Sequence, residues 1–218
     1  MKHIHKNPEP SELISWKQQQ QAIGVNCNYE SLQNPHKRKV HESLLNEQGY
    51  LCCYCCRSIV RNSSNIEHKQ DGSHIEHFAA QSKTDDALSV AYHNLHASCG
   101  SQEHWPHHCG NYRKNERIPI SPLDPDCESY FTYNSNGNIR AVADHPKQQE
   151  VQKTIDVLNL NHYDLAKSRE ELLDTLISLS DAEASELFQF CLKRNSEGKF
   201  EPYCAAMADY IQQYFSLS

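Results

Sequence analysis

The most constraining feature of this sequence is a run of four cysteines within five residues, in the stretch YLCCYCCRSI. Cys52, Cys53, Cys55 and Cys56 form two overlapping pairs with C-x-x-C spacing, either Cys52 with Cys55 or Cys53 with Cys56. Two thiols at this spacing can bind one metal ion, and packing alone does not require four thiols so close together. The sequence therefore predicts that at least one of the two pairs does chemical work.

The composition favours metal binding over disulfide bonding. The chain has 218 residues, a mean hydropathy of −0.78 and 22% charged residues. No window approaches the run of about 18 apolar residues that a membrane span needs, and the first 13 residues lack the apolar segment of a secretory signal. We therefore expect a cytoplasmic protein with no membrane segment. In that reducing compartment, clustered cysteines are more often metal ligands than disulfides.

A structural zinc site usually has four ligands, and a second pair of cysteines follows the first. Cys99 and Cys109 lie in ASCGSQEHWPHHCGN, and they are the cysteine pair near enough in sequence to complete such a site. Their spacing is long for a zinc knuckle. The three later cysteines are interpreted as small buried apolar residues; they are Cys127, Cys191 and Cys204.

Charge and histidine are unevenly distributed along the chain. Residues 1–115 hold 12 Lys+Arg, 11 Asp+Glu and 12 of the 14 histidines, whereas residues 116–218 hold 9 Lys+Arg and 17 Asp+Glu. Metal and proton chemistry is therefore expected in the N-terminal half. The acidic C-terminal half is a poor surface for nucleic acid, and it is either a solvated helical surface or a docking surface for a partner.

Periodicity and turn residues predict a mixture of helices and short strands. Ser11 is expected to cap the first helix and Gly49 to end the second. Residues 51–60 are expected to form a turn between short strands, 74–79 a strand, and 131–142 a hairpin around Asn136-Gly137. The long polar stretch 82–128 is expected to be irregular and held in place by a metal. The predicted helices cover residues 11–22, 37–48, 147–159, 163–179, 181–195 and 203–215.

Six phrases in a fixed order resemble a known family. They are EQGYLCCYC, HIEHFAAQS, NLHASC, HCGN, ISPLDPDCE and TIDVLNLN, and the match is strongest over residues 47–131. They resemble HNH endonucleases of the PtuB type, the nuclease subunits of Septu-type and retron-associated anti-phage systems. The resemblance implies an α+β, mainly helical chain with a zinc-stapled ββα-metal core. It divides into an N-terminal helical segment (1–49), the nuclease core with the following hairpin (50–145) and a C-terminal helical region (146–218).

The resemblance also implies roles for individual residues. The family's Leu-Cys-x-Tyr-Cys pattern selects Cys52 and Cys55 over Cys53 and Cys56, so that Cys52, Cys55, Cys99 and Cys109 would bind a structural Zn²⁺. By the same pattern, three further residues make up the active site. His77 would be the general base, Glu76 a ligand of the catalytic Mg²⁺ or Mn²⁺, and Asn94 the residue that positions the loop after His77.

The second protein ligand of the catalytic metal is less clearly marked. HNH proteins commonly carry His or Asn directly after the last zinc cysteine, where this chain has Gly110. Asn111 is the favoured ligand, and His107 and His108 are the alternatives. The candidates for contact with substrate phosphates are His74, Arg113 and Lys114.

The function implied by the resemblance is hydrolysis of phosphodiester bonds in nucleic acid, DNA more than RNA. The chain would be the effector of an anti-phage complex with a PtuA-like ATPase subunit, docked through the acidic C-terminal helices, and a retron RNA/DNA complex is a further possible partner. Two alternatives stay open from the sequence. One is an RNA-cleaving toxin with the same site, and the other is a zinc-stabilised adaptor without catalysis.

Overall fold

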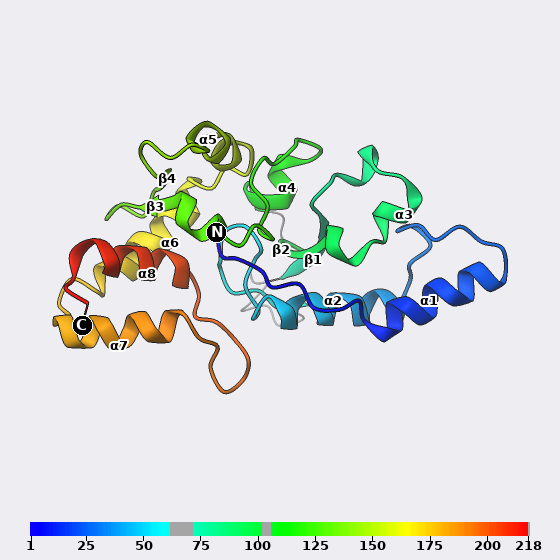
Figure 1. The fold of residues 1–218 in the computed structure, drawn as a ribbon, viewed down its shortest axis with the longest axis horizontal. Helices are drawn as coiled ribbons and strands as arrows, with labels where there is room; N and C mark the ends of the chain where they lie inside the picture. The colour runs from blue at the N-terminus through cyan, green and yellow to red at the C-terminus, as the bar shows by residue number, and fades with distance from the viewer. Residues whose placement is uncertain (62–71, 102–105, 218) are drawn as a thin grey trace.

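The computed structural model describes residues 1–61, 72–101 and 106–217. Over these ranges the chain is an α+β protein, as expected, and it has eight α-helices and two small antiparallel sheets (Figure 1). Helix α1 (Ser11–Ala22) lies at one end of the long axis, and α7 (Asp181–Cys191) and α8 (Cys204–Tyr214) lie at the other. The sheet of residues 73–77 and 95–99 lies between these ends, and the sheet of residues 131–133 and 139–141 lies beside α8.

The N-terminal helices follow the prediction closely, except for one cap. Helix α1 has its expected bounds, but Pro10 occupies the cap position, and the Ser11 hydroxyl donates to Glu12 instead of capping the backbone. Helix α2 (His36–Glu47) buries the apolar face that its periodicity predicts. Gly49 follows with a φ of +58°, a left-handed conformation that favours glycine after a helix.

A two-stranded antiparallel sheet carries the centre of the molecule. Strand β1 (Ser73–His77) pairs with β2 (Leu95–Cys99) in a register that places Glu76 opposite His96 and Ser73 opposite Cys99. All five residues of β2 are buried. A strand buried on both faces lacks the polar–apolar alternation that reveals strands in a sequence, so β2 was not predicted.

The expectation of an irregular stretch over 82–128 is wrong in its described part. Besides β2, that stretch contains helix α3 (Asp86–Ser89) and helix α4 (Cys109–Arg113). It also contains the short 3₁₀ turns η3 (Tyr92–Asn94) and η4 (Cys127–Tyr130), and a further turn, η2 (Gln81–Lys83), begins just before it. Each of these elements has at most five residues, which is too short for a hydrophobic period to be recognised in the sequence.

The predicted hairpin forms the second sheet. Strand β3 (Phe131–Tyr133) pairs with β4 (Ile139–Ala141), and Gly137 takes a φ of +73° in the turn between them. The buried Arg169 guanidinium donates to the carbonyl oxygens of Gly137 and Leu160 at 2.6 and 2.7 Å. This arginine fastens the turn to helix α6 (Tyr163–Asp174).

The C-terminal region is helical, as predicted, with two helices shorter than expected. Helix α5 (Gln148–Val157) is followed by α6, which ends at Asp174 rather than 179, and by α7, which ends at Cys191 rather than 195. Helix α7 begins with a capping box between Ser180 and Glu183. Among the described residues, no helix is long and apolar enough to cross a membrane.

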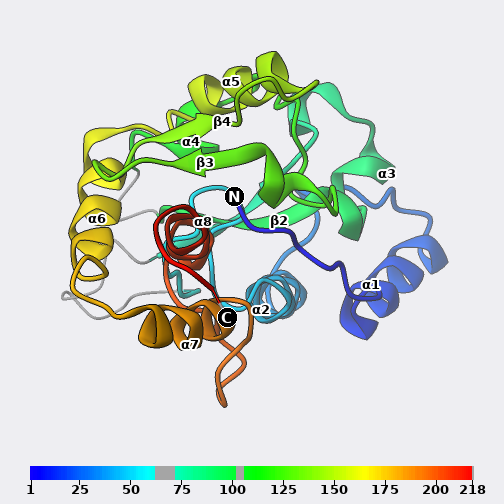
Figure 2. The same ribbon diagram turned by 60° about the vertical axis from the view of Figure 1, so that its left-hand side comes forward.

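Two buried apolar clusters hold these elements together. The first extends from Met1 to Ala206 and includes residues of α1, α2, both sheets and α5. The second joins Leu51 and Cys56 to residues of α6, α7 and α8 (Figure 2). The cysteine-rich turn therefore contributes to both clusters, while the three-segment division of the chain stays a prediction.

The Gly137 turn gives a test of this packing. A Cβ at this position would lie 2.0 Å from the carbonyl oxygen of Ala166, whereas a Cβ at Gly198, which has a similar φ of +75°, would meet open space. We expect Gly198→Ala to cost about 1 kcal/mol through φ alone. Gly137→Ala should cost about 3 kcal/mol, because overpacking is added. Urea denaturation measures both, and equal losses would contradict the packing of the hairpin on α6.

Candidate metal centre and active site

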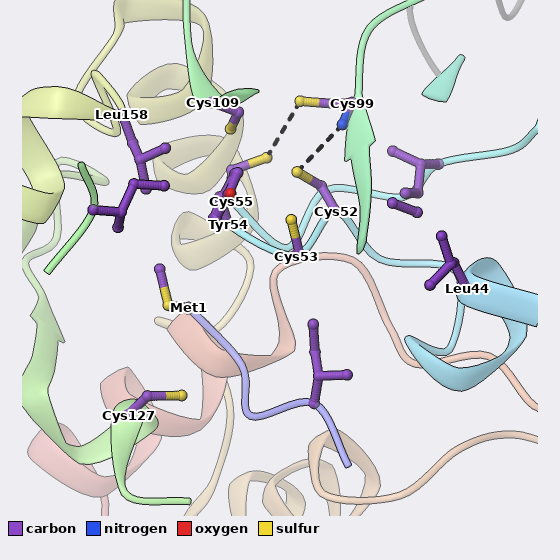
Figure 3. Close-up of a cluster of buried hydrophobic side chains, with 14 of the residues drawn as sticks. Met1, Leu44, Cys52, Cys53, Tyr54, Cys55, Cys99, Cys109, Cys127 and Leu158 are labelled. Carbon is purple, nitrogen blue, oxygen red and sulfur yellow. Dashed lines mark hydrogen bonds between the residues drawn. The ribbon is translucent and has the colours of Figure 1, made fainter. Parts of the chain in front are cut away.

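Four cysteine sulfurs meet at the end of the central sheet. Cys52 and Cys55 come from the turn bounded by the Leu51–Ser58 bridge, Cys99 from the end of β2, and Cys109 from the start of α4. All four residues are buried, and their sulfur atoms lie within 4.8 Å of one another. Figure 3 shows the contacts of Cys99 with Cys55 and with Cys52 at the centre of this group.

The spacing of the sulfurs suits a tetrahedral metal ion. The Sγ atoms of Cys55 and Cys99 are 3.9 Å apart, far beyond the ~2.05 Å of a disulfide. Two sulfurs bound to one tetrahedral zinc at about 2.3 Å lie roughly 3.8 Å apart. The donor set and its geometry therefore fit Zn²⁺, and these four cysteines could hold it.

The structure brings together the pair of thiols that the family pattern selects. Cys53 is buried in the first apolar cluster and Cys56 in the second, and neither belongs to the four-sulfur group found among the described residues. Cys56 has a φ of +62° and accepts a hydrogen bond at its carbonyl oxygen from the Tyr203 amide. The two remaining thiols of the run therefore lie among apolar side chains, and Cys53 also contacts the Cys52 thiol.

Polar groups around the cluster suit thiolates. The backbone amide of Cys99 points at the Cys52 sulfur at 3.4 Å, and the Nδ1 atom of His108 lies 3.3 Å from the Cys109 sulfur. Burial disfavours the Cys52 thiolate, but hydrogen bonds from the neighbouring cysteines outweigh burial and lower the pKa of this thiol well below its ordinary value. Burial and the neighbouring cysteines raise the pKa of Cys109. Metal ligands of this kind are thiolates, and a bound divalent cation would offset the cost of burying their negative charge.

Glu76 on β1 is a buried carboxylate with two different oxygens. Its Oε1 atom accepts hydrogen bonds from the Tyr54 hydroxyl at 3.1 Å and from Nε of Arg113 at 2.7 Å. Its Oε2 atom lies 3.4 Å from Nε2 of His74. Burial alone would raise the pKa of Glu76, but the contact with His74 and the charge of Arg113 lower it. The group is therefore ionised at neutral pH.

His77 is the last residue of β1, and one of its ring nitrogens is engaged in a hydrogen bond. Its Nε2 atom lies 2.9 Å from the carbonyl oxygen of Ser89, which can only accept, so Nε2 carries the proton. The Nδ1 atom of the neutral ring is then the proton acceptor. Burial lowers the pKa of His77, which favours this neutral form at neutral pH. The ring of Tyr29 meets the imidazole edge-on, with 4.4 Å between centroids, and fixes its plane.

Asn94 clamps the backbone that follows His77. Its Oδ1 atom accepts from the amide of Ala79 at 2.7 Å, and its Nδ2 atom donates to the carbonyl oxygens of Ala79 and Leu88 at 3.3 and 3.1 Å. Its own carbonyl oxygen accepts from the Phe78 amide. These contacts hold the backbone after His77, and the role in catalysis that the resemblance implies for Asn94 stays a prediction.

The residues of α4 are placed differently from one another. Arg113 is 3% exposed, and its guanidinium donates to Glu76, to the carbonyl oxygen of Glu116 and to that of His77. These contacts suit a positioning role more than contact with phosphates. Lys114 is exposed, whereas Asn111 donates from Nδ2 to the carbonyl oxygen of Pro106 at 2.9 Å.

Several contributors to the site had no clear signal in the sequence. Tyr54 and Gly110 belong to the quoted sequence phrases, but those phrases did not indicate that either residue lies beside Glu76. Tyr29 contacts His77 and lies far upstream of it in the sequence. Tyr54 could have been recognised as part of the site from the sequence, because it lies between two predicted metal ligands and a metal would fix its position. Tyr29 carries no such signal, because its contact with His77 depends on the fold of the N-terminal segment.

Comparison with known proteins agrees with this arrangement. The chain is 27% identical over 167 residues to a protein of Vibrio cholerae serotype O1 biovar El Tor named "Retron Vc95 putative HNH endonuclease". The match covers 76% of this chain and 78% of that protein. No family model matches the chain. The similarity supports a relationship with HNH endonucleases. A match that covers 76% of a chain of 218 residues must include the middle of that chain. It therefore spans most of the cysteine cluster and the strand that carries Glu76 and His77.

The cysteine cluster predicts how much metal the protein contains and which thiols bind it. Purified protein should contain one zinc per chain by elemental analysis. Cys52→Ser should lower the zinc content and destabilise the fold, because binding energy at such sites is also folding energy. Cys53→Ser is the matched control one residue away and should leave the zinc content unchanged. Folded protein without zinc, or zinc loss in Cys53→Ser but not in Cys52→Ser, would contradict this ligand set.

Proposed function

We propose that this chain is a metal-dependent HNH endonuclease that hydrolyses phosphodiester bonds of nucleic acid. The observation that carries the proposal is the pair Glu76–His77, a buried ionised carboxylate followed by a histidine with a fixed tautomer. Asn94 clamps the strand end that bears them, and the four-cysteine cluster lies beside it. The similarity to a protein named as an HNH endonuclease supports the same reaction.

The residues divide the chemical work in the following way. Glu76 would hold a divalent cation through its carboxylate. That cation, Mg²⁺ or Mn²⁺, supplies positive charge to the scissile phosphate and to the leaving oxygen. His77 takes a proton from the attacking water at Nδ1, while its Nε2–H remains on the Ser89 carbonyl oxygen. A histidine held in one tautomer by such a hydrogen bond presents the correct atom to the water.

Two buried groups keep these atoms in place. Arg113 contacts both the Glu76 carboxylate and the His77 carbonyl oxygen, so one side chain sets the position of both residues. Asn94 holds the backbone immediately after them. A positioned base and a bound metal ion together can catalyse phosphodiester hydrolysis, and the site offers a residue for each.

The biological setting is part of the same proposal. The relative's name associates it with a retron, and we propose that this chain likewise acts in an anti-phage system, with a PtuA-like ATPase subunit. DNA is the favoured substrate, and the cutting assay also tests RNA. The C-terminal helices are the proposed docking surface, because residues 116–218 carry 17 acidic against 9 basic residues and like charge repels a phosphate backbone.

His77→Ala should abolish cutting and leave the zinc content and the fold unchanged. The zinc-loaded chain is co-purified with the proposed PtuA-like ATPase and assayed on plasmid DNA, phage DNA and total RNA with Mg²⁺ or Mn²⁺. Loss of a general base typically lowers the rate about a hundred- to ten-thousand-fold. Glu76→Ala should also inactivate, and excess Mn²⁺ should partly restore it, because the loss there is one of metal affinity.

The control for this assay is His5→Ala, which removes an exposed histidine from the N-terminal segment. It should cut at the wild-type rate. If His77→Ala cuts every substrate as fast as the wild type, the assignment of catalysis to this site is wrong. If the wild type cuts none of the substrates, the catalytically silent adaptor is the better description.

The docking proposal predicts which surface changes break the complex. Ile177 and Phe190 are 65% and 47% exposed on the C-terminal helical region, where apolar side chains can contribute to an interface. The double variant Ile177→Asp, Phe190→Asp should lose the ATPase in co-purification. Ile23→Asp alters a similarly exposed residue, 70% exposed, just after α1, and should keep it. Full retention of the ATPase by the double variant counts against docking through these helices.

A further inference from the structure

The two oxygens of Glu76 face different surroundings, and this limits where a cation can bind. Oε1 already accepts from Tyr54 and Arg113. Oε2 faces His74 and the backbone of Gly110. A cation held by Glu76 would therefore bind at Oε2, and its second protein ligand must come from a side chain beside that atom.

Helix α4 presents backbone rather than a ligand to Oε2. A Cβ built at Gly110 would lie 2.5 Å from this oxygen, so any side chain there would displace the carboxylate. Arg113, three residues later, lies on the same helical face and occupies Oε1. Asn111 is rotated about 100° from Gly110 around the helix axis, and its amide donates to Pro106. Within the described residues, α4 therefore offers no neutral ligand at Oε2.

His74 lies on the correct face of the neighbouring strand. It is two residues before Glu76 on β1, so both side chains project from the same side of the sheet. Its Nδ1 atom lies 3.2 Å from the carbonyl oxygen of Gly100, which can only accept. The ring therefore donates from Nδ1, and Nε2 is the ring atom that faces Oε2 of Glu76, the position from which it would bind an ion.

The distance between the two donor atoms suits a shared ion. Nε2 of His74 and Oε2 of Glu76 are 3.4 Å apart. Two donors each about 2.1 Å from one ion lie roughly 3.0 Å apart at a right angle and 3.4 Å apart at the tetrahedral angle. A backbone carbonyl that fixes the opposite ring nitrogen is the usual support of a metal-binding histidine. The His74 side chain is 21% exposed, so an ion can reach it from solvent.

We propose that His74, rather than Asn111, is the second protein ligand of the catalytic metal, binding through Nε2 beside Oε2 of Glu76. This inference rests on the proposed function. A ligand pair of one imidazole and one carboxylate suits Mn²⁺ and later first-row ions better than Mg²⁺, which takes oxygen ligands. The site therefore selects for Mn²⁺ when both ions are present.

Manganese spectroscopy on the full-length, zinc-loaded chain tests the ligand directly and without an activity assay. Mn²⁺ is titrated by EPR, and electron spin echo modulation reports any ¹⁴N nucleus bound to the ion. The wild type should bind one Mn²⁺ with ¹⁴N modulation. His74→Ala should lose the modulation and bind at least about tenfold more weakly. Asn111→Ala and the histidine control His5→Ala should match the wild type in both measurements.

Three results would overturn the inference. They are ¹⁴N modulation that persists in His74→Ala, weakened binding in Asn111→Ala with normal binding in His74→Ala, and a wild type that binds no Mn²⁺ besides its zinc. His74→Gln, which keeps the bulk and polarity of the side chain, should also lose the modulation, and equal zinc content in every variant excludes a folding defect. Failure of the proposed function is read separately, from cutting by the wild type and by His77→Ala.

Discussion

The four-cysteine cluster is the constraint on which the rest of the site depends. Its sulfurs come from three segments: the turn around residue 54, the end of β2 and the start of α4. Each of these segments also contacts Glu76, through the Tyr54 hydroxyl, through the pairing of β2 with β1, and through Gly110 and Arg113 of α4. A metal ion that joins the sulfurs therefore also fixes the surroundings of the carboxylate. A two-stranded sheet is only marginally stable by itself, and a metal ion bound by the cluster would supply the missing stability.

A buried ion pair then sets the electrostatics of the site. Glu76 and Arg113 are both buried, and removing one partner of such a pair leaves an uncompensated charge that costs about 3–5 kcal/mol. The contact with His74 and the charge of Arg113 lower the pKa of Glu76 and keep it ionised despite its burial. The ion pair engages only one carboxylate oxygen, which leaves the other facing His74. The same arginine contacts the backbone of His77, so the proposed metal ligand and the proposed base share one support.

The sequence predicts the ligands of this site better than their surroundings. The spacing and the family pattern select Cys52 and Cys55, and the structure groups these two with Cys99 and Cys109. Helix α2 follows from its periodicity and from Gly49 after it, and α5 follows from its periodicity. Strand β2 does not, because burial on both faces removes the alternation that marks a strand. The burial of Arg113 was also missed, since arginine is usually exposed and its partner lies 37 residues away in the chain.

Hydrogen exchange with and without zinc tests the dependence of the site on the cluster most directly. The amides of β1 and β2 are measured in the zinc-loaded protein and again after the metal is removed by a chelator. The account predicts that protection is lost across both strands, including Glu76 and His77, while α7 and α8, which pack in the second cluster, lose much less. Protection of β1 and β2 that is unchanged after zinc removal would contradict it.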